Sequence, residues 1–145
     1  MERMSENFED LVDTFAFLDD WEDRYRHVIE MGKAMPTMDD VLKGPETKVD
    51  GCASQVWIAP EIEGTGPDAV LSFQGDSDAI IVRGLIAVLK TLFDQKPAKI
   101  IIETDAQAAL GQLGLDQHLS AQRSNGLRAM ITRIQSLAEA AAKTN

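Results

Sequence analysis

Apolar residues recur at helical spacing near the start of the chain. A first helix is predicted over residues 6–18, where the apolar positions share one face: Phe8, Leu11, Val12, Phe15 and Leu18. Asp20 is a favourable N-cap for a second helix, which runs from Trp21 to about Lys33 and ends at the glycine and proline of "GKAMP". The pattern therefore predicts an N-terminal helical hairpin.

The pattern changes from Ser54 onward to short β-favourable runs. "SQVWIA" (54–59) and "AVLSFQG" (69–75) are separated by a Pro/Gly-rich linker, "PEIEGTGPD" (60–68), and are expected to pair as antiparallel strands. Ser77 is expected to cap a long helix from about Asp78 to Phe93, in which Gly84 allows a neighbouring element to approach closely. This apolar helix is the predicted centre of the core.

Helical patterns return after the central helix. Residues 97–120 are expected to form short helices with breaks at Thr104, Gly111 and Gly114, although "KIIIE" (99–103) is equally compatible with a strand. A last helix is predicted from about Ser120 to Ala142, with one apolar face: Leu127, Met130, Ile131, Ile134 and Leu137. The elements predict an α+β fold in one domain, residues 1–145, with a small antiparallel sheet and the central and C-terminal helices packed on one side of it.

Charge limits the classes of partner. The chain of 145 residues carries 24 acidic and 14 basic side chains, a formal net charge of −10 and a pI near 4.5. Such a chain repels nucleic acid and anionic lipid, so neither is expected as a partner, whereas a basic patch on another protein is compatible with it. No apolar run approaches the ~18 residues that span a membrane, and the acidic first thirty residues lack a signal-peptide core. We therefore expect a soluble, cytoplasmic protein.

Several site types are disfavoured by the residue inventory. The single cysteine, Cys52, excludes an internal disulfide, and a zinc site of thiolate and imidazole ligands has only Cys52, His27 and His118 available, so no metal is expected. "GTGPDA" (64–69) matches a relaxed dinucleotide-binding pattern, but a strand-like run follows it where a helix is required. It is interpreted as a turn, and no cofactor is predicted.

Cys52 follows the turn signal "VDG" and precedes the strand that carries Val56 and Trp57. A lone cysteine is commonly a buried, inert small hydrophobe. From the residue types alone, a structural adaptor with an inert thiol therefore stays open beside a reactive thiol.

Four segments in order resemble the SufE family of sulfur acceptors, which work with cysteine desulfurases. "GCASQVWI" (51–58) is similar to the family motif G-C-x-S-x-V-W, and "FLDDWEDRYRHVIEMGKAMP" (17–36) resembles the family's helical hairpin. "DSDAIIVRGLIAVL" (76–89) resembles its central helix and "LGLDQHLSAQRSNGLRAMI" (113–131) its C-terminal signature. The chain departs from the family at "SAQRSNG", where relatives often place a proline and a small residue before the arginine, which alters the start of the helix.

The resemblance implies a SufE/IscU-like fold and a carrier role for Cys52. Cys52 would take the outer sulfur of a persulfide on a cysteine desulfurase, a PLP enzyme, and pass it to an iron–sulfur cluster scaffold complex. The chain would be an accessory protein that stimulates the desulfurase rather than an autonomous enzyme. An accessible thiolate at a turn suits attack on a sulfur atom in another protein. Both a monomer and a homodimer are compatible with the sequence.

Three further side chains are candidates for a role that supports the thiol. Arg123, in the C-terminal signature, is a candidate for stabilising thiolate or persulfide charge, but an ion pair at a helix start also accounts for it. His118 is a candidate proton donor or acceptor, with capping or packing as the alternative. Asp76 precedes the central helix, where a carboxylate is favoured in any protein. A rival function is a thiol-dependent hydrolase or redox sensor that uses Cys52 with His118.

Overall fold

The computed structural model describes residues 7–51 and 54–144. Its sheet has three antiparallel strands in the order β1-β2-β3: β1 (Val56–Glu63), β2 (Val70–Ser77) and β3 (Lys96–Pro97). The predicted pairing of the first two strands is confirmed. The two-residue β3 was not predicted, because so short a strand has no periodicity to detect.

β1 extends further than predicted. Residues 60–63, which the sequence assigns to a linker, belong to the strand, and the turn is confined to residues 64–69 with a 3₁₀ helix at Gly66–Asp68. Pro60 is tolerated because its cross-strand partner, Phe73, directs its backbone groups away from β1. The Phe73 N–H donates to Asp94 Oδ1 at 2.9 Å, and its carbonyl accepts from the Lys90 ammonium group. The interpretation of "GTGPDA" as a turn is confirmed.

The N-terminal hairpin is present, with α1 at Phe8–Ala16 and α2 at Trp21–Ala34. Asn7 caps α1 by accepting from the Asp10 N–H at 2.8 Å. Asp20 occupies the predicted N-cap position of α2, although its side chain makes no capping hydrogen bond.

The central helix, α3 (Ile80–Phe93), begins later than predicted. Ser77 is the last residue of β2 rather than the N-cap, which is Ala79; the Ser77 hydroxyl accepts from the Ala79 N–H at 3.2 Å. The close approach expected at Gly84 is confirmed, and the neighbour is α2: a Cβ on Gly84 would lie 2.2 Å from the Val28 carbonyl oxygen. Gly32 faces Gly84 across the same crossing, so α2 and α3 meet backbone to backbone.

The C-terminal third is helical throughout: α4 (Ala98–Glu103), α5 (Ala106–Gln112), α6 (Leu115–His118) and α7 (Ala121–Ala142). "KIIIE" is therefore a helix. The predicted breaks at Thr104 and Gly114 are confirmed, and Gly114 has the positive φ that favours glycine, but Gly111 lies inside α5, so the break predicted there is wrong. Ser120 caps α7 by accepting from the Arg123 N–H at 3.2 Å.

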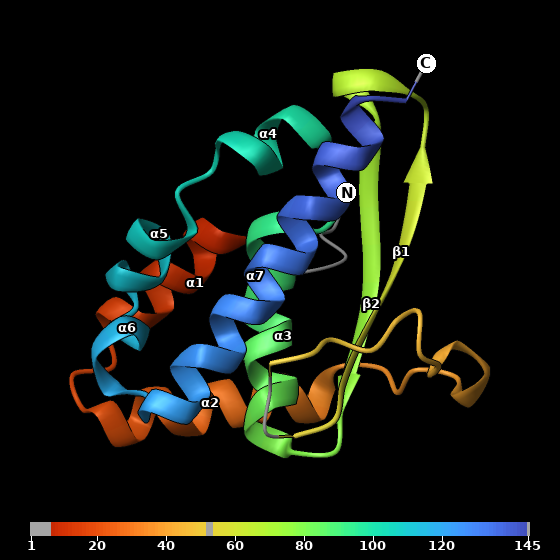
Figure 1. Cartoon of the computed structure of the whole chain (residues 1–145). Coiled ribbons are helices and arrows are strands. Elements are labelled where there is room, and N and C mark those ends of the chain that lie inside the picture. The colour runs from red at the N-terminus through yellow and green to blue at the C-terminus, as the bar shows by residue number, and fades with distance from the viewer. Residues whose placement is uncertain (1–6, 52–53, 145) are drawn as a thin grey trace.

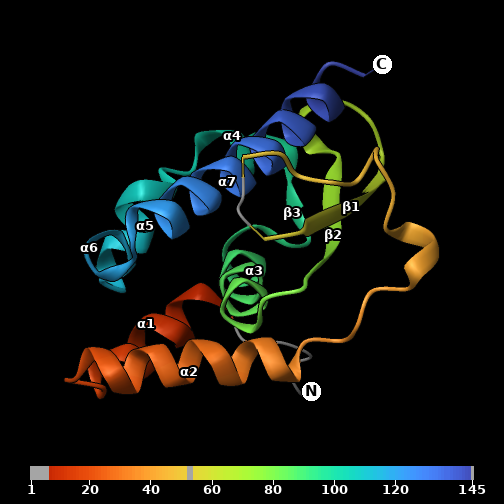
Figure 2. The same cartoon turned by 60° about the horizontal axis from the view of Figure 1, so that its bottom comes forward.

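The layers confirm the predicted α+β architecture. Figure 2 shows α3 between the α1–α2 hairpin and α7, with the sheet beside it, and Figure 1 shows α3 and α7 running along the sheet. The buried side chains of α3 and α7 meet the buried face of the sheet in one core: Val56, Ile58, Leu71, Phe73, Leu85, Leu89, Met130 and Ile134. In the part of the chain that is described, no helix is both long and apolar enough to span a membrane.

Candidate functional site

Cys52 and Ala53 lie outside the described residues, but the chain on both sides of them is described. Before Cys52, the chain pairs with β1: the Val49 N–H donates to the Val56 carbonyl at 2.9 Å, and the Ile58 N–H donates to the Thr47 carbonyl at 2.8 Å. Gly51 has φ of 93°, the positive value expected from the turn signal. Residues 50–55 therefore connect two antiparallel stems, and Cys52 belongs to this connection.

One stem of the connection is hydrogen-bonded to the residues just before α3, and the other is hydrogen-bonded to α7. On the far side of Cys52, the Gln55 N–H donates to Asp78 Oδ1 at 3.0 Å, and the Asp78 N–H donates back to the Gln55 carbonyl at 3.3 Å. On the near side, Arg133 of α7 donates from Nη2 to the Lys48 carbonyl at 2.6 Å. The chain is thus held by hydrogen bonds on both sides of Cys52, at Lys48 and at Gln55.

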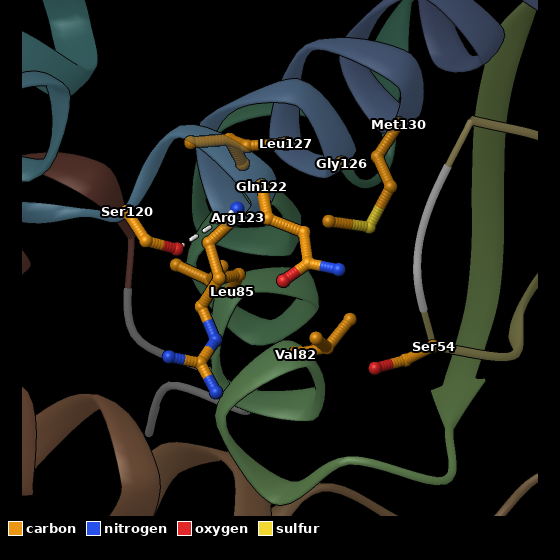
Figure 3. A pocket seen from close by; sticks show the side chains of 9 residues that line it. All are labelled: Ser54, Val82, Leu85, Ser120, Gln122, Arg123, Gly126, Leu127 and Met130. Carbon is orange, nitrogen blue, oxygen red and sulfur yellow. Dashed lines mark hydrogen bonds between the residues drawn. The ribbon is translucent and has the colours of Figure 1, made fainter.

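A cavity of about 150 Å³ lies between α3 and α7, and Ser54, from the connection that contains Cys52, lines one side of it. Val82 and Leu85 of α3 and Leu127 and Met130 of α7 form its apolar part. The remaining lining residues are Ser54, Ser120, Gln122, Arg123 and Gly126. Figure 3 shows Ser54, two residues after Cys52, on one side of this cavity and the start of α7 on the other.

Arg123 lies at this cavity, in the first turn of α7. Its backbone N–H is held by Ser120, while its side chain is exposed and makes no hydrogen bond or ion pair with the other residues that the structure describes. Figure 3 shows Arg123 and Gln122 both projecting from α7 towards α3. A guanidinium group that is not committed to a carboxylate can interact with an anion at the cavity.

His118 lies elsewhere. Its ring stacks on Trp21 of α2, with 4.5 Å between the ring centroids and an angle of 16° between the planes, and His118 does not line the cavity. The structure therefore brings Arg123, but not His118, to the cavity beside Ser54.

Asp76 takes part in a buried ion pair. Its side chain is 4% exposed and accepts from the N–H groups of Met38 (3.1 Å) and Ser77 (2.7 Å) and from the Arg83 guanidinium, with Lys43 Nζ 3.4 Å away. Burial raises the pKa of Asp76, but the hydrogen bonds from Met38, Ser77 and Arg83 outweigh burial and bring the pKa below its ordinary value.

Arg83 extends this network to the end of α2. It donates to the carbonyls of Gly32 at 3.2 Å and Met35 at 2.6 Å. Asp76 and Arg83 thereby bind the chain just after α2, at Met38 and Met35, and Lys43, which follows the 3₁₀ helix Asp40–Leu42, lies 3.4 Å from the Asp76 carboxylate.

The sequence pattern did not indicate Asp78 or Arg133 as residues of this region. "GDSDA" offers two acidic residues just before α3, and only Asp76 was singled out. Arg133 is 85 residues from Lys48, and its position within the periodic pattern of α7 resembles that of an ordinary surface arginine. Among the residues with described positions, no group of three His, Cys, Asp or Glu side chains gathers in metal-binding geometry.

The chain and its fold match known proteins. A family model named SufE, described as an Fe-S metabolism associated domain, matches residues 9–138. An uncharacterized SufE-like protein of Rhizobium meliloti (strain 1021) is 52% identical over 133 residues, which are 92% of this chain and 95% of the relative. A second uncharacterized SufE-like protein, from Rhizobium etli, is 50% identical over 129 residues, or 89% of this chain and 87% of the relative.

A solved structure shares the fold. The solution structure of a hypothetical protein from Thermus thermophilus has a TM-score of 0.73, covers 94% of this chain and 96% of its own, and is 16% identical. The fold is that of a small α+β domain in which the connection that contains Cys52 lies between two hydrogen-bonded stems. The chain belongs to the SufE family, as its four motif segments indicated, and its domain is of the type associated with iron–sulfur metabolism.

Proposed function

We propose that this protein is a sulfur carrier in which Cys52 accepts sulfur from a cysteine desulfurase and delivers it to an iron–sulfur cluster assembly scaffold. Family membership supports the pathway, and the connection between two anchored stems, beside the cavity at Ser54, supports the role of the thiol. The carrier is proposed to act in the cytoplasm as one domain over residues 1–145 and to stimulate the desulfurase, a PLP enzyme.

The chemical step is a thiolate–persulfide exchange. The Cys52 thiolate attacks the outer sulfur of the desulfurase persulfide, a new S–S bond forms on Cys52, and the S–S bond on the desulfurase breaks. The electron pair of that bond leaves with the desulfurase cysteine as a thiolate, so the exchange needs no external oxidant or reductant. The exposed Arg123 guanidinium, without a partner among the described residues, is proposed to favour the anionic sulfur at the cavity.

The position of His118 favours the carrier over a cysteine–histidine hydrolase or redox sensor. Such an enzyme needs the imidazole within hydrogen-bond reach of the thiol. His118 instead stacks on Trp21 and does not line the cavity that Ser54 lines.

Intact-mass measurement tests the proposal. Wild-type protein and Cys52→Ser are each incubated with a cysteine desulfurase, PLP and cysteine, and the mass is read before reduction. We expect the wild type to gain sulfur and Cys52→Ser to gain none and to lose stimulation of desulfurase turnover. The substitution is nearly isosteric, so its stability should stay within about 1 kcal/mol of wild type. A Cys52→Ser protein that still stimulates the desulfurase fully would remove the carrier mechanism.

A further inference from the structure

The carbonyl of Lys48 points away from the sheet towards α7. Thr47 and Val49 direct their bonding groups to β1, and Lys48 itself lies opposite Trp57 in a single antiparallel bridge. In such a ladder neighbouring residues direct their backbone groups to opposite sides, so the Lys48 carbonyl lies on the outer edge. Arg133 is the group that satisfies it, at 2.6 Å.

Ala129 lies one helical turn before Arg133 and therefore on the same face of α7. An ideal Cβ on Gly51 would lie 3.3 Å from the Ala129 Cβ, so the chain at Gly51 passes directly over this residue. Figure 2 shows the chain that leads to Cys52 passing beside α7. Residues 48–51 thus run along one face of α7, with Arg133 at the start of that path and Ala129 at its end.

The bond from Arg133 is of a strong kind. A hydrogen bond from a charged donor is roughly twice as strong as one between neutral groups. Arg133 makes no ion pair with the residues that the structure describes, so no carboxylate there competes for its guanidinium. This side chain therefore fixes the path of the chain just before the thiol.

We propose that Arg133 is a positioning residue for sulfur transfer: by holding the Lys48 carbonyl it fixes where residues 48–51 lead and so where Cys52 is presented to the desulfurase. This inference rests on the proposed carrier function. Losing a charge-assisted hydrogen bond changes a local equilibrium on the order of tenfold. If only the anchored arrangement docks productively, the apparent affinity for the desulfurase falls in proportion to the fraction of molecules that stay anchored, and so by at most the same factor.

The experiment compares Arg133→Met, which keeps the aliphatic stem, with Arg133→Lys, which keeps a donor. Arg128→Met is the matched control, because Arg128 is an exposed arginine on the same helix whose hydrogen bond goes to Asn125 of its own helix. Amide hydrogen exchange is followed in the peptide that contains Val49 and in a peptide from α7. Sulfur transfer is measured as a function of carrier concentration with a cysteine desulfurase and cysteine.

For Arg133→Met we expect exchange at Val49 to rise on the order of tenfold while α7 and the thermal midpoint stay as in wild type. The carrier concentration at half-maximal rate should rise, by at most about tenfold, with little change in the maximal rate. Arg133→Lys should restore much of both, and Arg128→Met should match wild type.

Two outcomes would overturn the role of Arg133. One is unchanged exchange at Val49 and an unchanged half-maximal concentration in Arg133→Met; the other is exchange that rises equally across α7, which marks a general loss of stability. If wild-type protein accepts no sulfur, the carrier function fails and the positioning role fails with it, while exchange at Val49 still reports separately whether Arg133 anchors the chain.

Discussion

Replacing Asp76 by Asn separates the charge of the buried ion pair from its shape. The Asp76 side chain is 4% exposed and its partner Arg83 is 14% exposed, so the pair is largely shielded from water. Asn keeps the size and one acceptor oxygen but leaves the Arg83 guanidinium without its carboxylate. Arg83 would still donate to the carbonyls of Gly32 and Met35.

The expected cost follows from that arrangement. Removing one partner of a buried ion pair costs about 3–5 kcal/mol, because the other charge stays buried. Since Arg83 retains two carbonyl partners, we expect the lower end, about 3 kcal/mol of unfolding free energy at neutral pH.

The sign of the pH dependence follows from the lowered pKa of Asp76. A carboxyl group with a lower pKa in the folded state stabilises the fold above its unfolded pKa of about 3.9, and this stabilisation is lost as the pH falls through the folded value. Wild type and Asp76→Asn should therefore differ most near neutral pH and converge in acid below about pH 3.9.

Urea denaturation of both proteins, at neutral pH and through the acid range, measures these differences. Asp68→Asn is the control: Asp68 is paired with Lys99 at 2.9 Å, but the two side chains are 82% and 52% exposed, so this substitution should shift the midpoint only slightly. If Asp76→Asn cost no more than Asp68→Asn, or if its cost did not change with pH, the assignment of stability to the buried charge would be refuted.

Three further predictions concern the helix crossing and the thiol. Gly84→Ala would place a Cβ 2.2 Å from the Val28 carbonyl oxygen, so urea titration should show a loss of about 3 kcal/mol; wild-type stability would mean that α2 and α3 separate without cost. Isolated Cys52 should react with iodoacetamide more slowly than free cysteine, and faster once a desulfurase lacking its own catalytic cysteine is added; fast alkylation that the desulfurase does not change would contradict a sheltered thiol. Asp78→Ala removes the acceptor of the Gln55 N–H and should speed alkylation of Cys52 on the order of tenfold, and an unchanged rate would show that this stem does not restrain the thiol.

The sequence predicted the long elements well, because many residues contribute to each periodic pattern. The hairpin, α3 and α7 follow from apolar spacing, and Ser120 was correctly placed at the start of α7. Two errors concern a proline and a glycine, and the first arises where a tertiary contact overrides local preference. Pro60 is accommodated in β1 because Phe73 bonds elsewhere, and Gly111 stays helical within α5.

The candidate site was predictable only through residues within recognisable motifs. Cys52 and Arg123 came from the resemblance to the SufE family, and Arg123 does lie at the cavity beside Ser54. Arg133 donates to the backbone carbonyl of a residue 85 positions earlier in the sequence. Every residue has such a carbonyl, so no local sequence pattern indicates this contact. Its position becomes evident only when α7 and the stem before Cys52 are placed side by side.

The side chains of Lys90 and Asp94 also bear on how this protein behaves at high concentration. β3 pairs with β2 only at Val70 and Leu71, and an unpaired strand edge is a template on which another chain can aggregate. Beyond that short pairing, Asp94 accepts from the Phe73 N–H and Lys90 donates to the Phe73 carbonyl, so both groups that an incoming strand would need there are already bonded. Two charged residues at the end of one helix thus protect this stretch of the sheet against edge-to-edge self-association.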